Sequence, residues 1–272
     1  MTTAIAPKNS HAARTPGDKT LTKGLQLLEA LAQCEAPRGI SELAHQLSLT
    51  KSNVHRLLQT LARCGYVTQE ASTERYLLSA KLWQVSRRTN PSDALQRLAR
   101  PILRRIVEQT NESVIFAIVE QDGLIVVDQV ETPIPVRVVF FSIGQSFPID
   151  RVIMMGKGLT ALQLIALAAR PEADALAVLR KLQEQLKKGK SFVDAQLSQI
   201  SATRKSGFAV NRGEWVIGAT AVAVPVFGVA QNLIGMLSCF GPADRFTESG
   251  ISKVRKILAL GADDLSLQLH KS

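Results

Sequence analysis

The fold of the N-terminal third of the chain is decided by the stretch Thr50-Lys51-Ser52-Asn53-Val54-His55-Arg56-Leu57-Leu58-Gln59-Thr60-Leu61. Its apolar residues stand at positions 54, 57, 58 and 61, which is the spacing of one buried face of an α-helix. Thr50 precedes the helix, where its side-chain oxygen can accept a hydrogen bond from a first-turn amide. Gly65 follows at a position suited to end the helix. The stretch therefore predicts an amphipathic helix between Thr50 and Gly65.

The opposite face of this helix is polar and carries no acidic residue. Advancing each residue by about 100° places these side chains on that face or at its flanks: Ser52, Asn53, His55, Arg56, Gln59, Thr60 and Arg63. Such groups bond phosphate oxygens and base edges of DNA. A solvated face with two arginines is the alternative, and the stretch alone does not decide between them.

The segments before this helix favour DNA binding. Residues 21–32 have the apolar spacing of a first helix. Glu42–Leu47 is expected to form a short second helix, with Ser41 as its N-cap, and Ser48-Leu49 then makes a tight turn. Two helices joined by a short turn, the second one basic outside, form a helix-turn-helix, whose second helix lies in the major groove.

A β-hairpin is expected directly after the second of these helices. The β-prone residues 66–68 and 75–78 flank a polar run at residues 69–74. A hairpin in this place is a wing, whose tip can reach DNA. Glu70 and Glu74 would repel phosphate there, so Arg75 is the one DNA contact that we expect from it.

The rest of the chain changes character after a further helix at Ser79–Arg88 and a break before Pro91. β-Branched runs at residues 114–119, 124–127 and 135–140 precede helices between residues 158 and 206. Strands follow at residues 208–211, 219–226 and 233–239, and a last helix covers residues 247–269. This order predicts an α+β fold with a largely antiparallel sheet covered by helices.

Length and charge support two domains with different partners. The chain has 272 residues, 46% of them hydrophobic, and a net charge of +10. Residues 1–90 hold 12 Lys and Arg against 6 Asp and Glu, so they carry +6 of that excess. This asymmetry points to a polyanion as the partner of the N-terminal part.

Cysteine and histidine usage argues against a metal site, a cofactor or a catalytic centre. The three cysteines are scattered, which fits reduced thiols in a cytosol. The C-terminal part has no histidine before His270 to act as a general base, and Cys239 has no evident activating partner. The longest apolar runs are too short to span a bilayer, so we expect a cytoplasmic protein that is not an enzyme.

From about Leu21 to the last helix, the sequence resembles the IclR family of transcriptional regulators. Five stretches carry the resemblance: Leu47 to Leu58; Gly65-Tyr66-Val67 with Tyr76-Leu77-Leu78; Gly156-Lys157-Gly158; Gly207 through Glu214 to Val226; and Leu237 to Pro242. The resemblance implies an N-terminal winged helix-turn-helix, a linker helix, and a C-terminal GAF-like effector-binding domain that dimerises and often pairs into tetramers. Accordingly, we expect a flexible arm at 1–19, the DNA-binding domain at 20–79, the linker helix at 80–90, and the effector-binding and oligomerisation domain at 91–272.

Two sets of site residues follow. The helix and wing assign DNA binding to Lys51, Ser52, Asn53, His55, Arg56, Gln59 and Arg75. The resemblance implies an effector pocket at Ile149, Met154, Met155, Asn211, Ala221, Ser238 and Phe240. The chain departs from the family pattern at Asp150-Arg151, where many members have His-Cys or His-Ala, and at Asn211, where several have an acid. The effector is therefore not transferable from any one relative.

The pocket residues are more apolar than a two- or three-carbon acid requires. They suit an aromatic or cyclic carboxylic acid, with Ser238 and Asn211 at its polar end and Arg151 or Arg212 paired with its carboxylate. Ordinary core beneath the sheet is the alternative interpretation of the same residues.

The favoured hypothesis is a ligand-responsive regulator of catabolic genes for a small organic acid. It would bind a pseudo-palindromic operator on double-stranded DNA as a homodimer or tetramer. Whether it represses or activates stays open. Two other hypotheses remain: a winged-helix module that binds protein or RNA, and a GAF-like redox enzyme that uses Cys239.

Overall fold

The computed structural model describes residues 18–34, 36–87, 91–120, 123–139, 141–151, 158–228 and 232–270. The chain forms two compact units, Met1–Asn90 and Pro91–Ser272, and each is described by itself. The predicted N-terminal arm lies outside the described residues apart from Asp18 and Lys19. No helix in the described ranges is long and apolar enough to cross a membrane.

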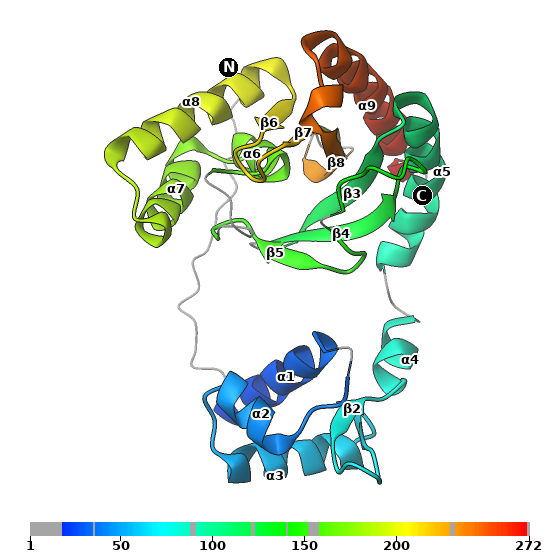
Figure 1. Cartoon of the computed structure of the whole chain (residues 1–272), viewed down its shortest axis with the longest axis vertical. Helices are drawn as coiled ribbons and strands as arrows, with labels where there is room; N and C mark the ends of the chain where they lie inside the picture. Colours follow the sequence, from blue (N-terminus) through cyan, green and yellow to red (C-terminus); the bar gives the residue numbers. More distant parts are fainter. Residues whose placement is uncertain are drawn as a thin grey trace, which may run out of the picture. The chain divides into compact units, whose positions relative to one another are not determined.

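The N-terminal unit is a winged helix-turn-helix (Figure 1). Its elements are α1 (Lys19–Ala32), α2 (Ile40–Gln46), α3 (Lys51–Arg63), β1 (Val67–Gln69), β2 (Tyr76–Leu78) and α4 (Lys81–Arg87). Strands β1 and β2 pair antiparallel, with Thr68 opposite Leu77. The three predicted helices and the hairpin are thus confirmed.

Local chemistry sets the ends of these helices. The Asp18 carboxylate accepts from the amides of Thr20 and Leu21, so α1 begins two residues before the predicted start. The predicted Ser41 cap is wrong, because α2 begins at Ile40 with Gly39 before it. The backbone of Arg38 pairs with that of Tyr76 in both directions, which keeps the chain extended until just before α2.

One hydrophobic core joins the helices to the wing. Its fully buried members include Leu27 of α1, Leu43 of α2, and Val54 and Leu58 of α3. Tyr76 of β2 closes this core from the hairpin side. The apolar face of α3 is therefore buried in the core, and its polar face is exposed.

The C-terminal unit is built on a six-stranded antiparallel sheet in the order β5-β4-β3-β8-β7-β6. Its elements are α5 (Pro91–Thr110), β3 (Ser113–Glu120), β4 (Gly123–Val130), β5 (Ser146–Pro148), α6 (Ala161–Ala168), α7 (Glu172–Leu186), α8 (Lys190–Ser206), β6 (Ala209–Arg212), β7 (Ala219–Phe227), β8 (Leu233–Pro242), the 3₁₀ turn η1 (Ala243–Arg245) and α9 (Glu248–Leu269). The predicted α+β architecture is confirmed.

One predicted strand is wrong. Residues 135–139 form no strand, and the edge of the sheet is instead the short β5. Pro133 and Pro135 supply no amide hydrogen to a ladder, which disfavours a strand in this run.

Helices cover both faces of the sheet (Figure 1). Helices α5 and α9 pack on one face, against Val222, Val224 and Val226 of β7. Helices α6, α7 and α8 pack on the other face, where Ala223 and Met236 belong to the core. Because side chains alternate along a strand, the two faces of β7 and β8 serve two separate cores. Of the predicted effector residues, Ile149, Ala221 and Phe240 lie on the α6 side.

Candidate functional site

The outer face of α3 gathers five of the predicted DNA-binding residues. The exposed ones are Lys51, Ser52, His55, Arg56 and Gln59. Asn53 differs, because its side chain is half-buried and its Oδ1 atom has no hydrogen-bond partner among the described residues. Helix α3 contains no acidic residue along its whole length. The face is therefore donor-rich and free of carboxylates.

The N-terminus of α3 is ordered by Thr50, whose Oγ1 accepts from the amide of Asn53 at 3.3 Å. Lys51 and Ser52 are the first two residues of the helix, beside the amides of its first turn. Helix N-termini attract anions through these amides and the helix dipole. The geometry suits a phosphate contact beside the outer face of α3.

A groove of about 660 Å³ separates α3 from the wing. Its lining residues are Ile40, His55, Gln59, Ala62, Arg63, Gln69, Glu74 and Tyr76. The side-chain nitrogen of Gln59 lies 3.2 Å from Nε2 of His55, within hydrogen-bond distance. This contact holds the two side chains side by side at the edge of the groove.

The predicted wing contact, Arg75, is engaged inside the DNA-binding unit. Its Nη2 lies 2.9 Å from Oε1 of Glu42, and its Nη1 donates to the carbonyl of Pro37 at 3.2 Å. The guanidinium thus ties the base of the wing to α2. The sequence could not indicate this, because Glu42 and Pro37 are distant in the chain.

Three of the seven predicted effector residues come together. Ala221 of β7 lies opposite Phe240 of β8, and Ser238 lies one pleat further along β8. They line a cavity of about 10 Å³ with Phe141, Thr160, Ala161, Leu162 and Trp215. That volume is about one water molecule, so an organic ligand enters only if side chains move.

Phe141 packs between two aromatic residues that line the same cavity. Its ring stacks on Trp215 with 5.1 Å between centroids and meets Phe240 edge-on at 5.9 Å. Phe141 was not among the residues predicted from the sequence. Its position depends on a tertiary contact with Trp215, which no local pattern indicates.

The other predicted effector residues fall into two groups. Ile149 and Asn211 are buried but do not line the cavity. Asn211 donates to the carbonyl of Leu159 at 2.6 Å and accepts from the amide of Trp215 at 3.3 Å, so it positions the wall rather than forming it. Met154 and Met155 lie outside the described residues.

The cationic partners predicted for a carboxylate are not aimed at this cavity. Arg212 pairs with Glu248 at 2.7 Å, and Arg151 is exposed and absent from the lining. Two hydroxyl residues, Ser238 and Thr160, are among those that line the cavity. Thr160 also caps α6, accepting from the amide of Gln163 at 3.1 Å.

Cys239 is unsuited to be a nucleophile. It is fully buried in the core beneath α5 and α9. Burial raises the pKa of its thiol far above the ordinary value, so the thiolate is not formed near neutral pH. Within the described ranges, no three His, Cys, Asp or Glu side chains come together as a metal site requires.

Known families and relatives match both units. The family described as "Bacterial transcriptional regulator IclR C-terminal" matches residues 88–267, and "IclR helix-turn-helix domain" matches residues 20–71. The HTH-type transcriptional regulator KdgR of Escherichia coli is 26% identical over 252 residues, covering 92% of each chain. The transcriptional repressor IclR of the same organism is 25% identical over 270 residues, covering 96% of this chain and 93% of its own.

A solved structure extends the likeness to the fold. The crystal structure of an IclR homolog complexed with 4-hydroxybenzoate, from Microbacterium hydrocarbonoxydans, superposes with a TM-score of 0.74 at 18% identity. The match covers 93% of this chain and all of that one. With family matches over both units, the chain belongs to the IclR family of transcriptional regulators, non-enzymatic DNA-binding proteins with a helix-turn-helix and an effector-binding domain.

Proposed function

We propose that this chain is a ligand-responsive, sequence-specific regulator that reads an operator with the outer face of α3. The observation that carries the proposal is the exposed, carboxylate-free face that joins Lys51, Ser52, His55, Arg56 and Gln59. Residues 20–79 bind DNA, residues 80–90 form the linker between the two domains, and residues 91–272 bind the effector.

The residues of this face divide into two roles. Arg56 and Gln59 project from the middle of α3 and contact bases or the adjacent backbone. Lys51 and Ser52, at the helix N-terminus, contact phosphates. Arg75 acts indirectly, because its ion pair with Glu42 fixes the angle at which the wing leaves the helices.

The operator is proposed to be pseudo-palindromic and bound by a homodimer. One recognition helix spans too few base pairs to select a site among about 10⁶ competitors, and a two-fold axis doubles the number of bases read. Helix α4 offers a candidate contact, since Trp83 and Val85 are 59% and 53% exposed. Large exposed apolar side chains of this kind are typical of association surfaces.

Selection from a random duplex library tests the DNA-binding part. The bound pool is expected to converge on two inverted half-sites whose centres lie about one helical turn, or a multiple of it, apart. Binding should weaken steeply with salt. A pool that stays random after repeated rounds would contradict sequence-specific reading.

The effector is proposed to be a small aromatic carboxylic acid. Its ring would take the place of the Phe141 ring, between Trp215 and Phe240, with its polar end at Ser238 and Thr160. The apolar lining supports this choice, and the 4-hydroxybenzoate named for one relative of the same fold motivates the probe. A ligand that moves Phe141 shifts the populations of two states only by its differential affinity for them.

Thermal denaturation with 4-hydroxybenzoate, benzoate, glyoxylate and pyruvate tests the effector class. Ligands that bind the native state raise the melting temperature by mass action. The aromatic acids are expected to do so, and Phe240→Ala should reduce that shift. A shift with glyoxylate or pyruvate and none with either aromatic acid would overturn the proposed class.

A further inference from the structure

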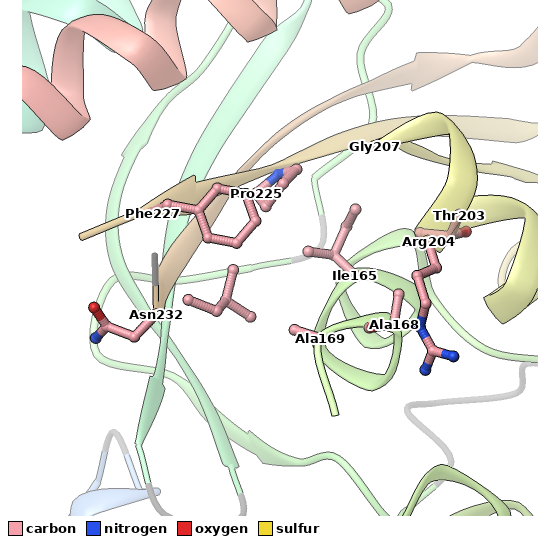
Figure 2. A pocket seen from close by; sticks show the side chains of 10 residues that line it. Ile165, Ala168, Ala169, Thr203, Arg204, Gly207, Pro225, Phe227 and Asn232 are labelled. Atoms are coloured by element: carbon pink, nitrogen blue, oxygen red, sulfur yellow. Dashed lines mark hydrogen bonds between the residues drawn. The ribbon is translucent and has the colours of Figure 1, made fainter. Parts of the chain in front are cut away.

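A second and larger cavity lies in the C-terminal unit, away from the proposed effector site. Its volume is about 390 Å³. Figure 2 shows its lining side chains, which are Ile165, Ala168, Ala169, Thr203, Arg204, Gly207, Pro225, Phe227, Asn232 and Leu233. We call it the distal pocket.

The distal pocket and the effector site lie at opposite ends of the same elements. The start of α6 lines the effector site through Ala161 and Leu162, whereas Ile165, Ala168 and Ala169 at its other end line the distal pocket. Strand β7 likewise contributes Ala221 to the effector site and Phe227 to the distal pocket. The two cavities share no residue, so a ligand in the distal pocket is not held by the effector site.

The lining is mainly apolar, with polar groups at its margins. Figure 2 shows Asn232 and Arg204 on opposite sides of the apolar side chains. The Arg204 guanidinium donates from Nε to the carbonyl of Ala168 at 3.0 Å and from Nη2 to that of Arg170 at 2.9 Å. These two bonds hold the positively charged guanidinium in a fixed position beside the cavity.

The distal pocket has a positive charge beside it and no negative charge in its lining. None of its lining residues is acidic, and among the described residues no carboxylate forms an ion pair with Arg204. A guanidinium has five N–H donors, so donors beyond the two that bond the carbonyls of Ala168 and Arg170 remain for a ligand. Small-molecule sites commonly measure about 300–1,000 Å³ and combine apolar walls with a few fixed polar groups.

We propose that the distal pocket is a second small-molecule site, which binds a small apolar carboxylic acid. Its hydrocarbon body packs against Phe227, Leu233 and Ile165, and its carboxylate lies at Arg204. The proposal does not rest on the effector assignment. It gives the effector-binding domain two separate ligand inputs on one face of its sheet.

Ligand-observed fluorine NMR of the full chain without DNA tests the proposal. The probe is 4-(trifluoromethyl)benzoate, and 4-(trifluoromethyl)benzyl alcohol is its neutral counterpart. The wild type is expected to bind the acid about tenfold more tightly than the alcohol, because a charge-assisted hydrogen bond is worth roughly one such factor. Arg204→Gln should remove that preference, and Arg204→Lys should keep part of it.

Two surface variants locate the binding. Ala169 is exposed and Phe227 is 36% exposed, so Ala169→Trp and Phe227→Ala should fold. The first fills the pocket and should abolish binding at the distal pocket, and the second removes an apolar wall and should weaken it about tenfold. Because the proposed effector site also takes aromatic acids, these variants are compared in the Ala221→Leu background, which fills the effector site and should leave binding at the distal pocket unchanged.

Three results would overturn the proposal. One is that Ala169→Trp and Phe227→Ala bind the acid as the wild type does. Another is that Ala221→Leu alone removes binding, which places the probe in the effector site and leaves the proposed function intact. The third is that the wild type binds no acid while Ala169→Trp changes its sedimentation, which assigns the pocket to a second copy of the chain. Circular dichroism of each variant confirms that it is folded.

Discussion

The side chains on α3 differ in what they can distinguish. Arg56 can form paired hydrogen bonds with a base edge, whereas Lys51 at the helix start offers a point charge to a phosphate. Both are exposed, so their replacement leaves the core of the DNA-binding unit intact. Their loss should therefore change binding and leave stability almost unaltered.

Lys51→Ala is expected to weaken binding to every duplex by a similar factor. Because a phosphate contact releases counterions, the slope of log K against log salt should become shallower by about 0.9 per half-site. Titrations at several salt concentrations, with the selected operator and a scrambled duplex, measure this. A variant that loses affinity for the operator alone would place Lys51 at a base instead.

The three cysteines should differ in reactivity. Cys64 is exposed and Cys34 half-buried, whereas Cys239 is buried and its pKa is raised by burial. Because a raised pKa keeps the thiol protonated near neutral pH, iodoacetamide should modify Cys64 and spare Cys239 in the native protein. Peptide mass spectrometry before and after denaturation checks this. Equal labelling of Cys239 in the native protein would reopen the redox hypothesis.

At the scale of elements, α5 and α9 approach closely at Gly261. A Cβ atom there would lie 2.8 Å from Cδ1 of Ile106 and 3.2 Å from Cγ2 of Ile102. The absence of a side chain thus lets two long helices pack against each other on one face of the sheet.

Gly261→Leu is expected to lower the free energy of unfolding by about 1–3 kcal/mol through overpacking. Ala259→Leu is the matched control, since Ala259 of the same helix is exposed and surface changes usually stay within about 0.5 kcal/mol. Urea denaturation of both variants makes the comparison. Equal stability of the two would show that the α5–α9 contact tolerates a side chain at this place.

The sequence predicted α3 well, because local chemistry controls this helix. Helix α3 has a clear apolar period and a capping threonine, and its outer face follows from that period alone. The Ser41 cap and the strand at residues 135–139 were wrong although only local chemistry was involved. The sequence also failed where a distant partner decides. Arg75 is held by Glu42, and Phe141 packs on Trp215. Of the seven residues inferred for the effector pocket from the family resemblance, Ala221, Ser238 and Phe240 line one small cavity.

At the scale of the whole molecule, the account requires two copies of the chain. The proposed contact on α4 includes Trp83, which is 59% exposed in one copy. Because burying an unpaired charge in an interface is costly, Trp83→Glu should weaken self-association and operator binding together. Gln84→Glu adds the same charge at the neighbouring exposed position and should change neither. Sedimentation equilibrium would contradict the assignment if both variants remained dimers.

The central claim is that α3 reads base sequence, and the specificity ratio of Arg56→Ala tests it most directly. Fluorescence anisotropy gives the affinities for the selected operator and a scrambled duplex at one salt concentration. Arg180→Ala, which removes an exposed arginine of α7, controls for net charge. Loss of a paired base contact should reduce the free-energy difference between binding operator and scrambled duplex by about 1–3 kcal/mol per half-site. Arg180→Ala should keep the wild-type specificity ratio. If Arg56→Ala kept the wild-type ratio, the outer face of α3 would not be the reading surface.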